Sequence, residues 1–176
     1  SEDEEVEEAA DRHRRSVEDS SRDLKKVLDE DRRTVAESSR KLKEILREVE
    51  REVKRVEDDG SVSDEEVRRM LDELRKLVER HHRENERLLR ESEKLVKKHH
   101  DDNERSLDEV RKLVEDREGD VEELKKRLKE LSDESRKSLE RVKRKLEETS
   151  RRSEESLRRV KKDAERLVRE IEKRAK

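Results

Sequence analysis

The sequence predicts an all-α protein, a straight, coiled-coil-like, up-down-up bundle of three helices of about 55 residues each. Apolar residues recur every three or four positions along almost the whole chain, and the only two glycines interrupt that pattern. Charged residues make up 60% of the 176 residues and hydrophobic ones 25%, without any proline. This composition is typical either of a disordered chain or of a long helical rod, and the helical periodicity favours the rod.

The first helix is expected over residues 2–58. Its apolar stripe runs from Val6 to Val56 and advances by about 3.6 residues per step, which is the period of a straight α-helix. Acidic residues fill positions 2–5, where the helix dipole favours negative charge. Gly60 is expected to take the left-handed conformation that ends a helix.

The second helix is expected over residues 63–118, with a stripe that runs on to Leu113. Ser63 and Glu66 have the spacing of a capping box, and Val62 with Val67 has that of a hydrophobic staple. Both patterns predict that the helix starts here.

The third helix is expected over residues 121–175. Gly119 ends the preceding helix, and Asp120 with Glu123 forms the next N-cap pattern. Basic residues gather at the far end, at Lys173, Arg174 and Lys176, where they suit the helix dipole. The loops are short, so consecutive helices are expected to run antiparallel in a single domain over residues 1–176.

Each helix contains an internal repeat with an offset of 18 residues. KLVERHHRENERLL at 76–89 matches KLVKKHHDDNERSL at 94–107 at nine of fourteen positions. SVEDSSRDLKKVL at 16–28 likewise matches TVAESSRKLKEIL at 34–46, and SDESRKSLERV at 132–142 matches SRRSEESLRRV at 150–160. Because 18 residues are five turns of a straight helix, each copy faces the same way about 27 Å further along.

Folding the chain at its loops brings the polar residues of the three helices to common heights. One layer is expected to join Ser16, Ser20, Ser21, His99, His100, Asn103, Ser135 and Ser138. A second would join Thr34, Ser38, Ser39, His81, His82, Asn85, Ser153 and Ser156, with Asn85 meeting Thr34 and Ser153 as Asn103 meets Ser16 and Ser135. A weaker third layer would join His13, Ser106 and Ser132.

The physical interpretation of these layers is a set of buried hydrogen-bond networks between layers of Leu and Val. A buried polar group without a partner costs roughly 1–3 kcal/mol. Layers that match in only one alignment therefore specify the register of the helices more than they add stability. The alternative is that these residues only dot solvated helix faces.

The chain resembles de novo designed helical bundles with buried hydrogen-bond networks. The resemblance covers the whole chain and rests on the copied SS, HHxxN and SxxSxxS motifs, the idealised helix ends and a surface of Glu, Lys, Arg and Asp. It implies a structural or self-assembling scaffold with no natural biochemical activity. The low apolar content departs from the pattern, and a natural coiled-coil rod is the rival interpretation.

Several function classes are not expected. Without cysteine there are no thiolate metal sites, and without Phe, Tyr or Trp there are no stacking platforms for bases. No apolar run is long enough for a membrane span or a signal peptide. The two His pairs lie too far apart to form one metal site. We therefore expect no enzyme, cofactor, metal, small-molecule substrate, nucleic-acid partner or membrane partner.

Two questions stay open at the level of sequence. Apolar doublets such as Leu88–Leu89 widen the stripes of the first two helices, which favours contact with a second copy or with a separate designed helix, as in half of a heterodimer. Buried histidines resist protonation, so a second interpretation is an oligomer that comes apart when the pH falls.

Overall fold

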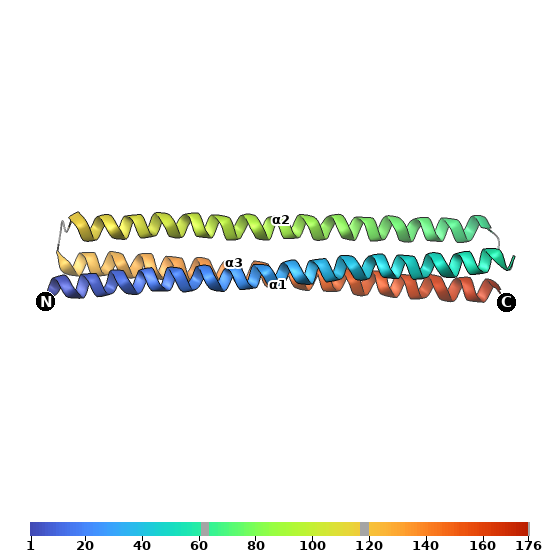
Figure 1. The fold of residues 1–176 in the computed structure, drawn as a ribbon, viewed down its shortest axis with the longest axis horizontal. Coiled ribbons are helices and arrows are strands. Elements are labelled where there is room, and N and C mark those ends of the chain that lie inside the picture. Colours follow the sequence, from blue (N-terminus) through green and yellow to red (C-terminus); the bar gives the residue numbers. More distant parts are fainter. Residues whose placement is uncertain (61–63, 117–119, 176) are drawn as a thin grey trace. The chain divides into compact units, whose positions relative to one another are not determined.

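Three long α-helices make up the protein. A computed structural model describes residues 1–60, 64–116 and 120–175. The helices are α1 (Glu2–Asp58), α2 (Asp64–Asp116) and α3 (Val121–Ala175), of 57, 53 and 55 residues (Figure 1). The described residues contain no β-strand. The predicted all-α fold is therefore confirmed.

The helix ends follow the local sequence where the structure describes them. Gly60 has a φ of 66°, the left-handed conformation predicted for it, and its N–H donates to the carbonyl of Glu57 at 3.0 Å. At the start of α3, the Asp120 carbonyl accepts from Leu124 N–H at 3.1 Å and its carboxylate accepts from Glu122 N–H at 3.5 Å. Asp120 is thus the predicted N-cap. Val62, Ser63 and Gly119 lie outside the described residues.

The contacts divide the chain into two compact units, each built from a segment of all three helices. Unit 1 comprises Ser1–Glu30 and Glu91–Glu147, and unit 2 comprises Asp31–Arg90 and Glu148–Lys176. The expectation of one domain over residues 1–176 stays a prediction.

In unit 1, two apolar clusters flank the polar residues. One cluster includes Val6 of α1, Val110 of α2 and Leu128 of α3, and the other includes Leu24 and Leu146. Ion pairs connect α3 to its neighbours at Lys125–Glu5, Lys143–Asp23 and Arg127–Glu109. Residue numbers rise together along α1 and α3 in these pairs, so those helices run parallel, and α2 runs against both.

Unit 2 has one continuous apolar cluster. Its fully buried members include Leu42 and Val56 of α1, Val67 of α2 and Ile171 of α3. Between α1 and α2, Glu50 pairs with Arg75 and Glu57 with Arg68, at 3.6 and 3.5 Å. The numbers rise along α1 as they fall along α2, so the helices alternate in direction here as well.

Most of the apolar doublets are taken up by the cores of the two units. Val27 and Leu95 pack against a unit 1 cluster, and Ile45, Leu46 and Leu77 pack against that of unit 2. No large hydrophobic side chain is exposed among the residues that the structure describes. Leu88 is buried and Leu89 half-buried, and neither belongs to one of these clusters. Part of the widened stripes therefore serves three-helix packing, and a partner copy or partner helix stays a proposal.

Candidate functional site

The polar residues of unit 1 form hydrogen-bond networks that link all three helices. His13 of α1 is only 1% exposed, and its ring lies between two serines. His13 Nδ1 is 2.8 Å from Ser132 Oγ on α3, and His13 Nε2 is 2.8 Å from Ser106 Oγ on α2. A neutral imidazole has one donor and one acceptor nitrogen, so one serine accepts from the ring and the other donates to it.

His99 is the centre of the second network in unit 1. Its Nε2 atom is 3.0 Å from both Ser20 Oγ and Asn103 Nδ2, and its Nδ1 atom is 2.8 Å from Ser138 Oγ. Asn103 in turn accepts a hydrogen bond at its Oδ1 from Ser135 Oγ at 2.8 Å. One histidine of α2 therefore links α1 directly to α3.

The geometry assigns the proton on the His99 ring. An amide nitrogen can only donate, so Nε2 must accept from Asn103 Nδ2. The ring proton is then on Nδ1, which donates to Ser138 Oγ, while the Ser20 hydroxyl donates to Nε2. The network is consequently built around a neutral imidazole.

A more exposed branch lies beside this centre. Ser21 Oγ is 3.3 Å from His100 Nδ1, and both residues are half-buried. The rings of His99 and His100 have centroids 6.3 Å apart, with an interplanar angle of 57°. The copied SS and HH motifs thus pair in register, one pair buried and one near the solvent.

The equivalent residues of unit 2 bond in a different way. Ser38 Oγ accepts from Asn85 Nδ2 at 3.4 Å and donates to the backbone carbonyl of Ser153 at 3.3 Å. Ser39 Oγ is 3.2 Å from His82 Nδ1, as in the exposed branch of unit 1. The other ring nitrogen of His82, Nε2, is 3.1 Å from the Glu86 carboxylate.

Four of the predicted residues do not join a network. Ser16 is exposed, whereas Thr34, His81 and Ser156 are half-buried, and none of the four makes a hydrogen bond to another residue that the structure describes. The expected contacts of Asn103 with Ser16 and of Asn85 with Thr34 are therefore absent from the described residues. Ser16 adjoins the core residue Val17 and lies about 100° away from it around the helix, so it has the right height but faces solvent.

A further polar site was not predicted from the sequence. Asp31 of α1 is 2% exposed and accepts a hydrogen bond from Ser150 Oγ of α3. Thr149 in unit 2 and Ser92 in unit 1 are also buried. Asp31, Ser92 and Thr149 occupy positions of the apolar stripes, whereas Ser150 does not. A polar residue inside an apolar stripe was therefore the signal that could have identified these three.

Burial shifts the acid–base equilibria of three histidines. Desolvation lowers the pKa of His13 and that of His99, because burial disfavours the charged imidazolium. The neighbouring His100 lowers the pKa of His99 further, and Asp102 opposes this. The pKa of His81 is also lowered, first by desolvation and then by Arg159 and Arg80.

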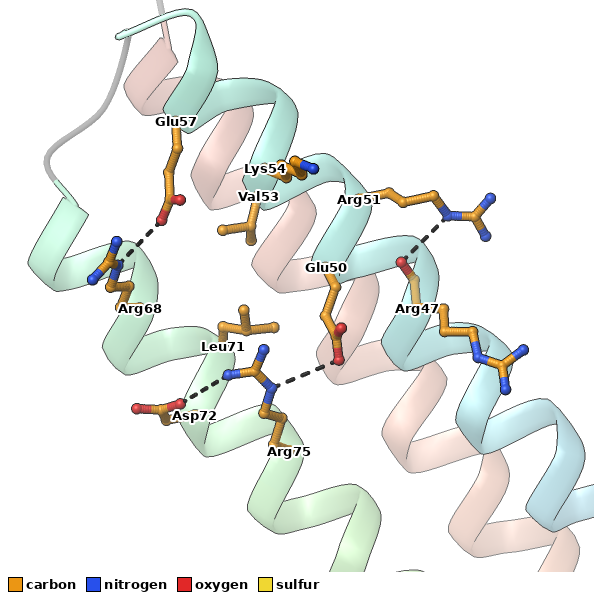
Figure 2. Close-up of a pocket in the computed structure, with 10 residues that line it drawn as sticks. All are labelled: Arg47, Glu50, Arg51, Val53, Lys54, Glu57, Arg68, Leu71, Asp72 and Arg75. Carbon is orange, nitrogen blue, oxygen red and sulfur yellow. Dashed lines mark hydrogen bonds and ion pairs between the residues drawn. The ribbon is translucent and has the colours of Figure 1, made fainter.

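One groove between the helices of unit 2 is lined mainly by charged residues. In Figure 2, a groove of unit 2 shows Arg68 directed at Glu57, and Arg75 at Glu50 and Asp72. Its lining also includes Arg47, Arg51, Val53, Lys54 and Leu71. Small-molecule sites are usually apolar with a few polar groups, and this lining is the reverse.

The described residues show neither a metal-binding group nor a membrane-spanning helix, and the comparisons with known proteins found no relative. Among the described residues, no group of three or more His, Asp or Glu side chains is placed to hold a metal ion. Nor does any described helix have a stretch that is long and apolar enough to cross a membrane. Searches against protein-family models, curated proteins and solved structures each found no match.

Proposed function

We propose that this chain is a structural scaffold without enzymatic activity, in which buried polar networks fix the alignment of the three helices. The observation that carries the proposal is the His99 network. Its ring bonds Ser20 of α1 and Ser138 of α3, and its Nε2 also meets Asn103. Each bond needs one particular height of one helix beside another.

The cost of misalignment explains how such a network specifies structure. Sliding α1 by one turn moves it about 5.4 Å, which would place an apolar side chain opposite the His99 ring. An unpaired buried polar group costs about 1–3 kcal/mol, whereas the apolar layers would tolerate the slip much better. The network therefore separates the intended register from its neighbours.

The same geometry argues against catalysis. Ser20 and His99 form a serine–histidine pair, but they are 6% and 1% exposed, so a substrate has no access to the hydroxyl. Both ring nitrogens are also occupied within the network. The resemblance to designed bundles and the idealised helix ends support an artificial scaffold as the class of protein.

Replacing the network by leucine tests the proposal. The double variant His99→Leu/Asn103→Leu is made together with Ser20→Ala, Ser135→Ala and Ser138→Ala, so that no hydroxyl of the network loses its partner. We expect stability to be kept or raised, because apolar replacements of a whole buried polar group are often neutral or stabilising. We also expect loss of a single alignment, seen as extra peaks in a ¹H–¹⁵N spectrum or as several masses in native mass spectrometry. Ser16→Ala, which changes an exposed serine outside the networks, is the control. One species with an unchanged peak count in the combined variant would contradict the proposal.

A second candidate is a self-associating form that acid dissociates. The lowered pKa values of His13 and His99 favour it, because protonation would break networks that need neutral rings. Size exclusion with light scattering at pH 7.5 and pH 4.5 tests it, with refractive-index detection because the chain lacks Trp and Tyr. A 21.3 kDa species at both pH values would exclude this candidate, whereas a multiple of that mass only at pH 7.5 would support it.

A further inference from the structure

The 18-residue repeat gives every member of the His99 network a counterpart in unit 2. The counterparts share residue type and helix, so the two sets allow a direct comparison within one chain. Ser20, His99, Asn103, Ser135 and Ser138 correspond in turn to Ser38, His81, Asn85, Ser153 and Ser156.

The two sets differ in the position of one imidazole. His99 is 1% exposed and bonded at both nitrogens, whereas His81 is half-buried and makes no hydrogen bond to any residue that the structure describes. Ser156 is the counterpart of Ser138, which accepts the hydrogen bond from His99 Nδ1. Ser156 likewise makes no hydrogen bond within the described ranges. The central histidine of the unit 2 network is therefore outside the network.

The buried atoms of unit 2 reflect this difference. Asn85 and Ser153 are both 0% exposed, yet Asn85 Oδ1 and Ser153 Oγ have no hydrogen-bond partner among the described residues. Their counterparts, Asn103 Oδ1 and Ser135 Oγ, bond each other at 2.8 Å. With the ring displaced, Asn85 Nδ2 instead donates to Ser38. Unit 2 thus contains the same residues as the His99 network, but not the hydrogen bonds that His99, Asn103 and Ser135 make in unit 1.

The charges around the two rings differ at one position. Asp163 of α3 acts on His81 and favours its charged form, as does Glu84 of α2. Eighteen residues earlier, the counterpart of Asp163 is Lys145, which has the opposite charge, whereas the counterpart of Glu84 is Asp102. Only the position of Asp163 differs in sign, although Arg159 of the same helix acts more strongly against a charged His81 ring than Asp163 acts for it.

We infer that His81 is a two-position switch. Its ring lies outside the network when it is protonated, and turns inward when neutral to bond Ser38 and Ser156 as His99 bonds Ser20 and Ser138. In the inward position Asn85 is free to take the geometry of Asn103, so that Ser153 Oγ donates to Asn85 Oδ1. The inference concerns unit 2 and does not depend on whether the chain serves as a scaffold.

Groups from all three helices set the balance between the two positions. Arg80 of α2 and Arg159 of α3 oppose the charge on the ring, and Glu84 and Asp163 favour it. On α1 the ring is level with the uncharged Ser38 and Ser39. The charged residues beside them, Glu37, Arg40 and Glu44, pair with one another along α1. Desolvation has the largest effect on the pKa of His81 and favours the neutral ring. The inward position, as buried as that of His99, would favour the neutral ring more strongly.

Imidazole NMR on the full chain tests the switch. The ¹³Cε1–¹Hε1 signals of the five histidines are titrated between pH 8.5 and 5.0 and assigned with single His→Gln variants. If the neutral ring bonds Ser156, the Ser156→Ala variant weakens only the inward position, and the pKa of His81 rises by about 0.5 pH unit, a threefold change in the equilibrium. Asp163→Asn removes a carboxylate that favours the charged ring, so it lowers the pKa of His81. Contacts between His81 Hε1 and Ser156 Hβ are expected at pH 8.5 and lost at pH 5.0.

Matched variants keep the test specific. Asn103→Ala is the positive control, because it removes a hydrogen bond that only the neutral His99 ring accepts at Nε2, and it is expected to raise the pKa of His99. Ser16→Ala, at an exposed position, is expected to change neither titration. Ser156 makes no bond in the outward arrangement, so its loss leaves the fold intact. An unchanged His81 titration in Ser156→Ala, or the absence of His81–Ser156 contacts at pH 8.5, would overturn the inference.

Discussion

Lowering the pH from 7.5 to 5.5 is expected to destabilise unit 1 through His13 and His99. Both side chains are 1% exposed and bonded at both ring nitrogens. Burial lowers the pKa of each below the value of about 6.5 that it has in the unfolded chain. Their contribution to stability is therefore complete above pH 6.5, and it is lost as the pH falls from there towards the lowered pKa values.

The size of the effect follows from proton linkage. Between its folded and unfolded pKa, one histidine lowers the free energy of unfolding by up to about 1.4 kcal/mol for each pH unit. His13 and His99 together give a slope of up to about 2.7 kcal/mol per pH unit, and His81 adds to it in unit 2. Domains of ordinary stability have about 5–15 kcal/mol in total, so one pH unit is enough for a clear signal.

Urea unfolding followed by circular dichroism at 222 nm measures this slope. The double variant His13→Gln/His99→Gln is expected to have a much smaller slope, whereas Ser16→Ala, at an exposed position outside the networks, keeps the full one. Equal stability of the parent chain at pH 7.5 and 5.5 would refute the reasoning, and so would an undiminished slope in the double variant.

Three substitutions test other parts of the fold by the same unfolding measurement. Leu24→Ala removes a fully buried side chain from a unit 1 cluster and should cost about 2–5 kcal/mol; a loss below 1 kcal/mol would mean that the site is not packed as described. Gly60→Ala should cost about 1 kcal/mol from its φ of 66° alone, since no atom lies within 4 Å of an added Cβ, and a gain in stability would contradict that conformation. Asn103→Ala should cost about 1–3 kcal/mol because it leaves the Ser135 hydroxyl without its partner and removes one of the hydrogen bonds of His99, so a neutral result would argue against the network.

Helix positions and heights could be read from the sequence because both depend on simple geometry. A straight helix rises 1.5 Å per residue, so short loops fix which residues of neighbouring helices are level. This rule places His13 beside Ser106 and Ser132, and the structure shows both contacts. Height alone does not give the direction of a side chain around its helix, and for that reason Ser16 was placed in a network although it faces solvent.

The position that a side chain takes was the second feature that the sequence could not predict. Two copies of one motif have the same heights and directions, so the sequence predicts the same bonds for His81 as for His99. The structure distinguishes them, because a side chain can take another position at the same height: His99 is bonded at both ring nitrogens, whereas His81 is half-buried outside the network. Asp31 was missed for a related reason: an acid inside an apolar stripe is read as an interruption of the core until its partner, Ser150, is seen beside it.

The different cores of the two units lead to one more expectation. Unit 2 contains a continuous apolar cluster from Leu42 to Val56 on α1, which has no titratable member. Over Val6–Leu24 the same helix passes through two clusters separated by polar layers. Protonation weakens bonds in those layers and leaves apolar contacts unchanged, so acid should loosen α1 locally around His13.

Hydrogen exchange at pH 7.5 and 5.5 can detect this difference once the intrinsic pH dependence of exchange is removed. Amide protection near His13 should fall by up to about tenfold for each 1.4 kcal/mol lost, whereas protection around Leu42–Val56 should change less. His13→Leu is the matched control, because it removes the titrating group and should abolish the local loss. A uniform fall along all of α1 would instead show that the helix opens as one cooperative element. In that case the polar layers would govern the stability of the whole chain and not only that of their own unit.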